Sequence, residues 1–184
     1  MPDNFYVITG GPGAGKTTLL EALAQKGYRC IPEVARKIIS EQIRDNGTAL
    51  PWLDFTLYTQ IMLERSVLSY TEAANTLPTD QPVFFDRGIP DTLCYAELTH
   101  QPITATMGTY AREYRYNTNV FILPPWKAIY HTDTERKQTW EEAIATYEQM
   151  VHTYRQHGYT IIEVPQDTVE NRVAFILRHS VSTS

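Results

Sequence analysis

The chain has 184 residues, of which 42% are hydrophobic and 20% are charged, and its formal net charge at pH 7 is −5. This length predicts one domain, residues 1–184, with a single core, and no apolar run approaches the ~20 residues that a membrane-spanning helix needs. The acidic balance argues against a general nucleic-acid binder, which requires a surplus of basic residues.

The two cysteines, Cys30 and Cys94, do not form a C-x-x-C motif. We therefore expect reduced thiols and no structural zinc site. The start "MPDNF" lacks the basic segment of a secretion signal, which favours a cytoplasmic location. A homodimer stays open, because nothing in the sequence fixes the oligomeric state.

Five short apolar runs predict β-strands, and helix-like segments separate them. Short apolar strands that alternate with helices are typical of a parallel α/β sheet covered on both faces. Gly27 and Gly158 stand where the helices before the second and fifth strands should end. Ligands of such sheets bind beyond the carboxyl ends of the strands, so the residues that follow each strand are candidates for a site. The predicted strands are Phe5–Ile8, Tyr28–Ile31, Val83–Asp86, Asn119–Leu123 and Thr160–Val164.

Directly after the first predicted strand, residues 10–17 read "GGPGAGKT" and fit the pattern G-x-x-x-x-G-K-[ST] at every fixed position. An amphipathic helix follows, which is the context that a phosphate-binding loop, or P-loop, requires. Glycines let the backbone turn its N–H groups toward phosphates. A Gly-rich turn without a ligand would give no reason for the Lys-Thr pair. The residues expected to hold ATP or GTP are Gly10, Gly11, Pro12, Gly13, Ala14, Gly15, Lys16, Thr17 and Thr18.

Four residues are candidates for chemistry at the phosphates. Lys16 is expected to reach the β- and γ-phosphates, and Thr17 to ligate Mg²⁺. Asp86 ends the third strand, and its carboxylate would face the same Mg²⁺ if that strand neighbours the first. Arg87 would stabilise the phosphoryl group in transfer through its planar fork of donors, or would form a structural ion pair instead. Asp91 is expected near the positive end of the next helix.

Glu33 follows the second predicted strand and opens a helix, with Arg36 one turn further on the same side. A carboxylate there is a candidate general base for an acceptor hydroxyl, and Arg36 a candidate ligand for an anionic part of the substrate. The helix dipole alone also favours an acid in the first turn, so a structural role for Glu33 stays open.

Basic residues at two other places complete the candidates. Residues 126–140 lie between the fourth strand and the next helix, and we expect them to form a lid whose Arg136 closes over the phosphates. Arg112 and Arg115, in "YAREYRY", are compatible with substrate binding or with plain surface.

Several segments together resemble a known family: "GGPGAGKTT", "PEVAR", "FFDRGIPD", "LPPW", "DTERKQTWEEA" and "VPQDTVENRVAFIL". They are similar to the small P-loop "predicted ATPases" of the AAA_28 type, which are related to the ribosylnicotinamide kinase domain of NadR. More distantly, Asp86, Arg87 and Glu33 match acids and an arginine of nucleoside and thymidylate kinases. The resemblance implies a three-layer fold, a five-stranded parallel sheet in the order 2-3-1-4-5 and Mg-nucleotide binding, without fixing a substrate.

Two functions are compatible with these residues. The first is a small-molecule kinase that transfers the γ-phosphate of ATP to a hydroxyl or phosphate of a nucleoside-like or other small acceptor. The alternative is a nucleotide-dependent ATPase or GTPase switch that binds a protein or phosphoinositide partner. A ring-forming motor is disfavoured because Arg87, and not glutamate, follows Asp86, and a Ras-like GTPase because the motif N-K-x-D does not occur.

Overall fold

The computed structural model describes residues 2–129 and 139–180. Helical segments separate the strands along these residues, as the apolar runs predict, with two helices between β2 and β3 and two between β3 and β4. The strands are β1 (Phe5–Gly10), β2 (Arg29–Ile31), β3 (Val83–Asp86), β4 (Asn119–Leu123) and β5 (Thr160–Glu163). The helices are α1 (Lys16–Gln25), α2 (Val34–Arg44), α3 (Phe55–Thr76), α4 (Ile89–Leu98), α5 (Ala105–Glu113), α6 (Trp140–Gln156) and α7 (Val169–Ser180).

The strands form one parallel sheet in the order β2-β3-β1-β4-β5. This confirms the predicted fold class and strand order. Ile8 of β1 lies in register with Asp86 of β3. The strand that ends at Asp86 is therefore the direct neighbour of the strand that leads into the P-loop.

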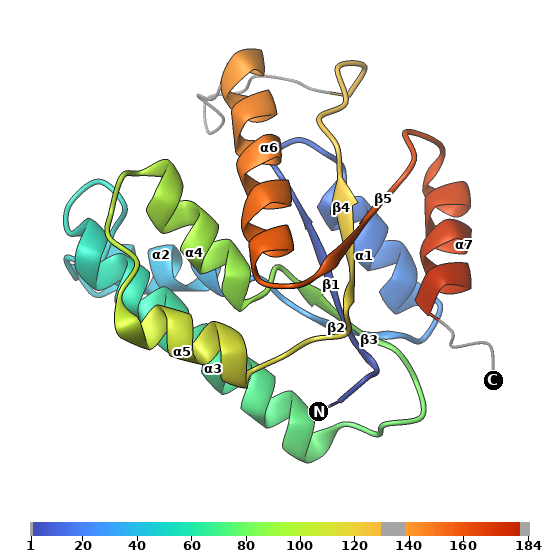
Figure 1. Cartoon of the computed structure of the whole chain (residues 1–184), viewed down its shortest axis with the longest axis horizontal. Coiled ribbons are helices and arrows are strands. Elements are labelled where there is room, and N and C mark those ends of the chain that lie inside the picture. The colour runs from blue at the N-terminus through green and yellow to red at the C-terminus, as the bar shows by residue number, and fades with distance from the viewer. Residues whose placement is uncertain (1, 130–138, 181–184) are drawn as a thin grey trace.

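Helices cover both faces of the sheet, and the alternation of side chains along β1 explains why. Phe5 and Val7 belong to the core shared with α3, α4, α5 and α6, whereas Tyr6 and Ile8 belong to the core shared with α1 and α7. Successive side chains of a strand point to opposite faces, so a strand covered on both faces is apolar throughout. Figure 1 shows α1 and α7 on one side of the sheet and α3 to α6 on the other.

Three helices begin within a few residues of a strand end. The helix α1 follows β1, α2 follows β2 and α4 follows β3, so their N-termini gather at the carboxyl edge of the sheet. The N-terminus of a helix carries partial positive charge and unpaired N–H groups, which favour anions. This edge is therefore suited to phosphates.

Two glycines reverse the chain at the opposite edge. Gly27 and Gly158 have φ values of 91° and 76°, in the left-handed region that glycine adopts without strain. They end α1 and α6 before β2 and β5, as predicted. In the part of the chain that the structure describes, no helix is long and apolar enough to cross a membrane.

Candidate functional site

The P-loop lies between β1 and α1. Two of its glycines, Gly10 and Gly15, are required because a side chain at either position would collide with neighbouring protein atoms. Gly15 precedes α1 with φ 80°, and a Cβ at this position would lie 2.8 Å from Nη1 of Arg172. A Cβ at Gly10 would lie 2.8 Å from the carbonyl oxygen of Leu123. Gly11 differs, because no protein atom lies within 4 Å of a Cβ there. Within residues 2–129 and 139–180, a side chain at Gly11 would therefore meet open space.

A buried arginine supports the loop from α7. Arg172 is 3% exposed, and its Nη2 donates a hydrogen bond of 3.1 Å to the carbonyl of Ala14. Its guanidinium lies 5.7 Å from the centre of the Trp126 ring. Burial lowers the pKa of Arg172, and among the described residues its Nε has no hydrogen-bond partner. Arg172 is thus a structural part of the P-loop that the sequence analysis did not identify.

We predict that Gly15→Ala destabilises the protein by about 1–2 kcal/mol, because alanine resists a left-handed conformation and its Cβ meets Arg172. Gly11→Ala is the matched control, and its free energy of unfolding should equal that of the wild type. Chemical denaturation measures both. Equal stability of the two variants would contradict the packing described for Gly15.

Lys16 and Asp86 contact each other at the start of α1 and the end of β3. The Lys16 ammonium donates to the Asp86 carboxylate, and the two side chains are only 7% and 15% exposed. Burial lowers the pKa of Lys16, and the nearby Arg87 charge acts in the same direction. Burial raises the pKa of Asp86 against the effect of Lys16. Lys16, predicted to bind phosphates, and Asp86, predicted to bind the metal, therefore lie in contact at one partly buried site.

Glu33 and Arg87 form a second ion pair beside the first. Arg87 Nε lies 2.9 Å from Glu33 Oε1, and Arg36 Nε lies 3.5 Å from Glu33 Oε2. Burial alone would raise the pKa of Glu33, but the charges of Arg87, Lys16 and Arg36 together lower it. Glu33 is therefore ionised at neutral pH. Glu33 is the N-cap residue of α2, but its side chain makes no capping hydrogen bond. Helix capping therefore does not explain why a glutamate stands at this position.

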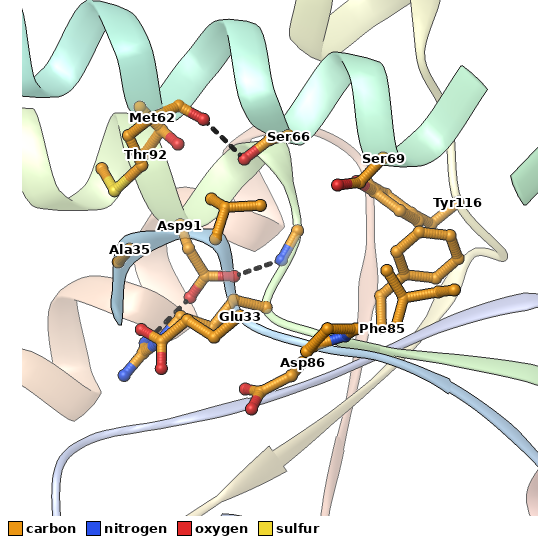
Figure 2. A pocket seen from close by; sticks show the side chains of 15 residues that line it. Glu33, Ala35, Met62, Ser66, Ser69, Phe85, Asp86, Asp91, Thr92 and Tyr116 are labelled. Atoms are coloured by element: carbon orange, nitrogen blue, oxygen red, sulfur yellow. Dashed lines mark hydrogen bonds and ion pairs between the residues drawn. The ribbon is translucent and has the colours of Figure 1, made fainter. Parts of the chain in front are cut away.

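Asp91 connects Arg87 to the rest of the molecule. Asp91 is 7% exposed and accepts hydrogen bonds from the Gly88 amide at 2.7 Å and from the hydroxyls of Thr9 and Tyr154, each at 2.5 Å. Its Oδ1 also lies 3.4 Å from Arg87 Nη1. Figure 2 shows a small pocket at the end of β3, also lined by Asp86 and Tyr116, in which the Asp91 carboxylate lies close to Glu33. Asp91 lies in the first turn of α4, as predicted, and its carboxylate also joins α4 to β1 and α6 through hydrogen bonds.

Arg87 itself has an unusual backbone. Its φ of 69° is positive, which is uncommon for a residue other than glycine and costs free energy. The ion pairs with Glu33 and Asp91 hold the side chain in place. Burial opposes the charge of Arg87, but the three neighbouring carboxylates outweigh it and raise the pKa. The structural ion pair that the sequence left open is therefore present, at a position next to the P-loop.

Arg112 and Arg115 lie away from this site, which corrects their proposed role in substrate binding. Arg115 Nη1 donates to the His157 carbonyl at 2.6 Å, and its guanidinium lies 4.0 Å from the centre of the Tyr159 ring. Burial and the charges of both arginines lower the pKa of His157. The physical reason is topological: both arginines precede β4, and Tyr159 precedes β5, so they lie at the amino edge of the sheet.

Three of the remaining candidate residues are exposed, and one lies outside the described residues. Thr17 and Thr18 are exposed in the first turn of α1, and Arg36 is exposed beside Glu33. Arg136 lies outside the described residues. Thr139 caps α6 through a hydrogen bond from the Glu142 amide, so the end of the expected lid segment, 126–140, is the start of this helix.

A cavity of about 710 Å³ opens beside Glu33 and Arg87. This volume is within the range of small-molecule sites. Its walls come from α2 and α3 on one side and α4 and α6 on the other, and Pro12 of the P-loop reaches it. The lining residues are Pro12, Glu33, Ala35, Tyr58, Met62, Arg87, Asp91, Cys94, Tyr95, Leu98, Thr99, Glu142, Ala145, Thr146 and Met150. We refer to this space as the acceptor cavity.

A family model for the AAA domain of type AAA_28 matches residues 5–172, which include the P-loop, Glu33, Asp86 and Arg87. The chain belongs to this family. No curated protein sequence matches it. The family membership confirms the resemblance drawn from the separate sequence segments.

Solved structures share the fold at low sequence identity. Deoxyadenosine kinase from M. mycoides with bound dATP has a TM-score of 0.60 and 16% identity, over 95% of this chain and 98% of that chain. NadR in complex with NR has a TM-score of 0.73 and 17% identity, over 98% of this chain and 52% of that chain. Thymidylate kinase from Ehrlichia chaffeensis has a TM-score of 0.60 and 14% identity, over 97% and 98%. The chain thus has the fold of P-loop kinases.

Proposed function

We propose that this protein binds Mg-ATP and transfers the γ-phosphate to a hydroxyl or phosphate of a small acceptor. The observation that carries the proposal is the acceptor cavity of about 710 Å³, which brings Glu33, Arg87 and the P-loop residue Pro12 to one space. A nucleotide switch needs a phosphate site but no second cavity of this size beside it. The kinase fold of the similar structures supports the same conclusion.

On the donor side, we propose that residues 10–18 hold the nucleotide phosphates. The loop fits them, because Gly10 and Gly15 hold φ values of 153° and 80°, a backbone that residues with side chains adopt only with strain and that lets the N–H groups turn toward phosphates. Lys16 would exchange the Asp86 carboxylate for the β- and γ-phosphates. Thr17 and Asp86 would hold Mg²⁺, which, when bound, neutralises charge on the phosphate oxygens. GTP remains an alternative donor.

On the acceptor side, Glu33 would take the proton of the attacking hydroxyl. The acceptor oxygen forms a bond to the γ-phosphorus, the bond from that phosphorus to the bridging oxygen breaks, and ADP leaves. In a loose transition state the attacking oxygen is only slightly bonded, so a carboxylate of low pKa suffices. Arg87 and the lid arginine, Arg136, would stabilise the charge on the moving phosphoryl group.

The proposal is tested with γ-labelled ATP and Mg²⁺, incubated with the protein alone and with pools of nucleosides, nucleotides and other small hydroxyl compounds. Transfer of label to one small molecule supports the kinase and identifies its acceptor class. Tight nucleotide binding with only slow release of free phosphate in every pool would overturn it in favour of the switch. The partner affinity of a switch should then differ between the ATP and ADP states.

We predict that Glu33→Gln lowers acceptor phosphorylation by about 10²–10⁴-fold, the usual contribution of a general base. ATP affinity should change little, because glutamine can still accept a hydrogen bond from Arg87. Glu41→Gln is the matched control, since Glu41 lies on α2, the helix that follows Glu33, and pairs with Arg65 outside the acceptor cavity. Steady-state rates and ATP titrations measure both variants. An unchanged rate in Glu33→Gln would remove Glu33 as the base.

A further inference from the structure

We infer that the acceptor is an uncharged or cationic ring compound with a hydroxyl group, such as a nucleoside, and not a phosphorylated or carboxylated compound. The inference rests on the proposed function and specifies the substrate class of the same site. Two independent features of the acceptor cavity carry it: the sign of its charges and the chemistry of its walls.

The ionisable side chains of the acceptor cavity are mostly acidic. Among the described residues that line it, three are carboxylates, Glu33, Asp91 and Glu142, and one is a cation, Arg87. A phosphate or carboxylate entering this space would face like charges, which disfavours binding strongly. A neutral or positively charged acceptor meets no such repulsion.

Arg87, the one cation among the described lining residues, is already paired with carboxylates. Arg87 lies 2.9 Å from Glu33 and 3.4 Å from Asp91. Glu33 and Asp91 occupy Nε and Nη1 of Arg87, so an anionic acceptor could reach only the remaining donors of Arg87 and would lie beside both carboxylates, which is unfavourable. Arg36 offers little replacement, because its side chain is 70% exposed and pairs with Glu33 outside the cavity lining.

The walls of the acceptor cavity are suited to a ring. Tyr58 and Tyr95 contact each other edge to face with 5.9 Å between ring centres, and Phe55 stacks on Tyr95 at 5.0 Å. This stacking restricts the orientation of the Tyr95 ring. Met62 and Leu98 add apolar surface to the same cavity. Aromatic and aliphatic walls of this kind bind planar rings by contact with their faces and edges.

One buried hydroxyl is available to orient such a ring. Tyr58 is 4% exposed and lines the acceptor cavity, and its hydroxyl has no hydrogen-bond partner among residues 2–129 and 139–180. Burial raises the pKa of Tyr58, so it remains a donor. A ring nitrogen, a carbonyl or a sugar oxygen can accept this hydrogen bond.

The test compares matched pairs of acceptors in the label-transfer assay. The probes are adenosine, guanosine, cytidine, thymidine and nicotinamide riboside, each beside its 5′-monophosphate, and one cyclic hydroxy acid. We expect at least one nucleoside to have a kcat/KM about tenfold or more above that of its monophosphate. Preferred transfer to a monophosphate or to the hydroxy acid would overturn the inference, while the proposed kinase activity would stand.

A charge added to the cavity wall provides a second measurement. Leu98→Arg should lower the nucleoside-to-monophosphate ratio of kcat/KM by about tenfold. Leu68→Arg is the matched control, because Leu68 is exposed on α3 outside the acceptor cavity, and it should leave the ratio unchanged. An unchanged ratio in Leu98→Arg, with the fold intact by circular dichroism, would contradict the electrostatic argument.

Binding calorimetry separates the two proposals. Titration of the wild-type protein with each nucleoside and its monophosphate measures selectivity without any turnover. Nucleoside binding in the absence of label transfer supports a nucleoside as the ligand of the cavity and overturns the kinase. Equal or tighter binding of the monophosphates, with a non-hydrolysable ATP analogue filling the γ-phosphate position, overturns the acceptor class.

Discussion

Lys16→Met is expected to abolish phosphoryl transfer, with a fall in kcat of at least about 10²–10³-fold, as is usual when one charge-stabilising donor is removed. Lys16 is buried at the start of α1, and its ammonium contacts the Asp86 carboxylate. Methionine keeps much of the volume and removes the charge that the γ-phosphate requires. The transfer assay measures the rate, and titration with a non-hydrolysable ATP analogue measures the accompanying loss of affinity.

A double variant separates this catalytic role from a structural one. Lys16→Met leaves the Asp86 carboxylate partly buried without its partner, which destabilises the protein. Asp86→Asn in the same chain removes the unpaired charge, so we expect stability to recover while activity remains absent. Lys37→Met, on the exposed side of α2, should behave like the wild type. Retained transfer in Lys16→Met would remove the proposed phosphate site.

The strands and the P-loop could be predicted from the sequence because their signals are local. An apolar run such as Val83–Asp86 specifies a strand buried on both faces, and "GGPGAGKT" specifies a turn that only glycine-rich backbone can make. The order of the strands is not a local property. It was expected from the family resemblance, and the sheet confirms it.

Asp91 and Arg172 show what the sequence analysis could not find. Asp91 bonds to Tyr154, which is 63 residues away in the chain, and Arg172 bonds to Ala14, which is 158 residues away. The partner of a buried polar group depends on tertiary packing, and no spacing rule brings these residues together. A weak signal existed for Arg172, because it stands directly before Val173 in a helix whose apolar face is buried.

The positions of Arg112 and Arg115, unlike those of Asp91 and Arg172, could have been predicted from the sequence. Both residues precede the strand Asn119–Leu123, and in a parallel sheet the segment before a strand lies at the amino edge. Their basic side chains left substrate binding open beside plain surface, but chain direction already placed them away from the carboxyl edge. Direction along the chain is therefore a stronger criterion than charge for residues that flank a parallel strand.

Asp91→Ala is expected to destabilise the protein by about 3–5 kcal/mol, the usual cost of removing one member of a buried ionic network. Asp91 accepts hydrogen bonds from Thr9 on β1, Gly88 before α4 and Tyr154 on α6. Its loss leaves these buried donors unpaired and leaves Arg87 with one fewer carboxylate. The same change should lower phosphoryl transfer, because the Arg87 side chain would no longer be held in its strained position.

Asp54→Ala is the control, since Asp54 also lies at the start of a helix and accepts a hydrogen bond from the Leu57 amide, but at an exposed position. Loss of such a cap costs about 1 kcal/mol and should not affect transfer. Urea denaturation compares the two variants, and Tyr154→Phe should lie between them because it removes a single hydrogen bond. If Asp91→Ala were no less stable than Asp54→Ala, the three elements would not depend on this carboxylate. If its stability fell but its rate of transfer stayed normal, Arg87 would need no support from Asp91, and the network would serve the fold alone.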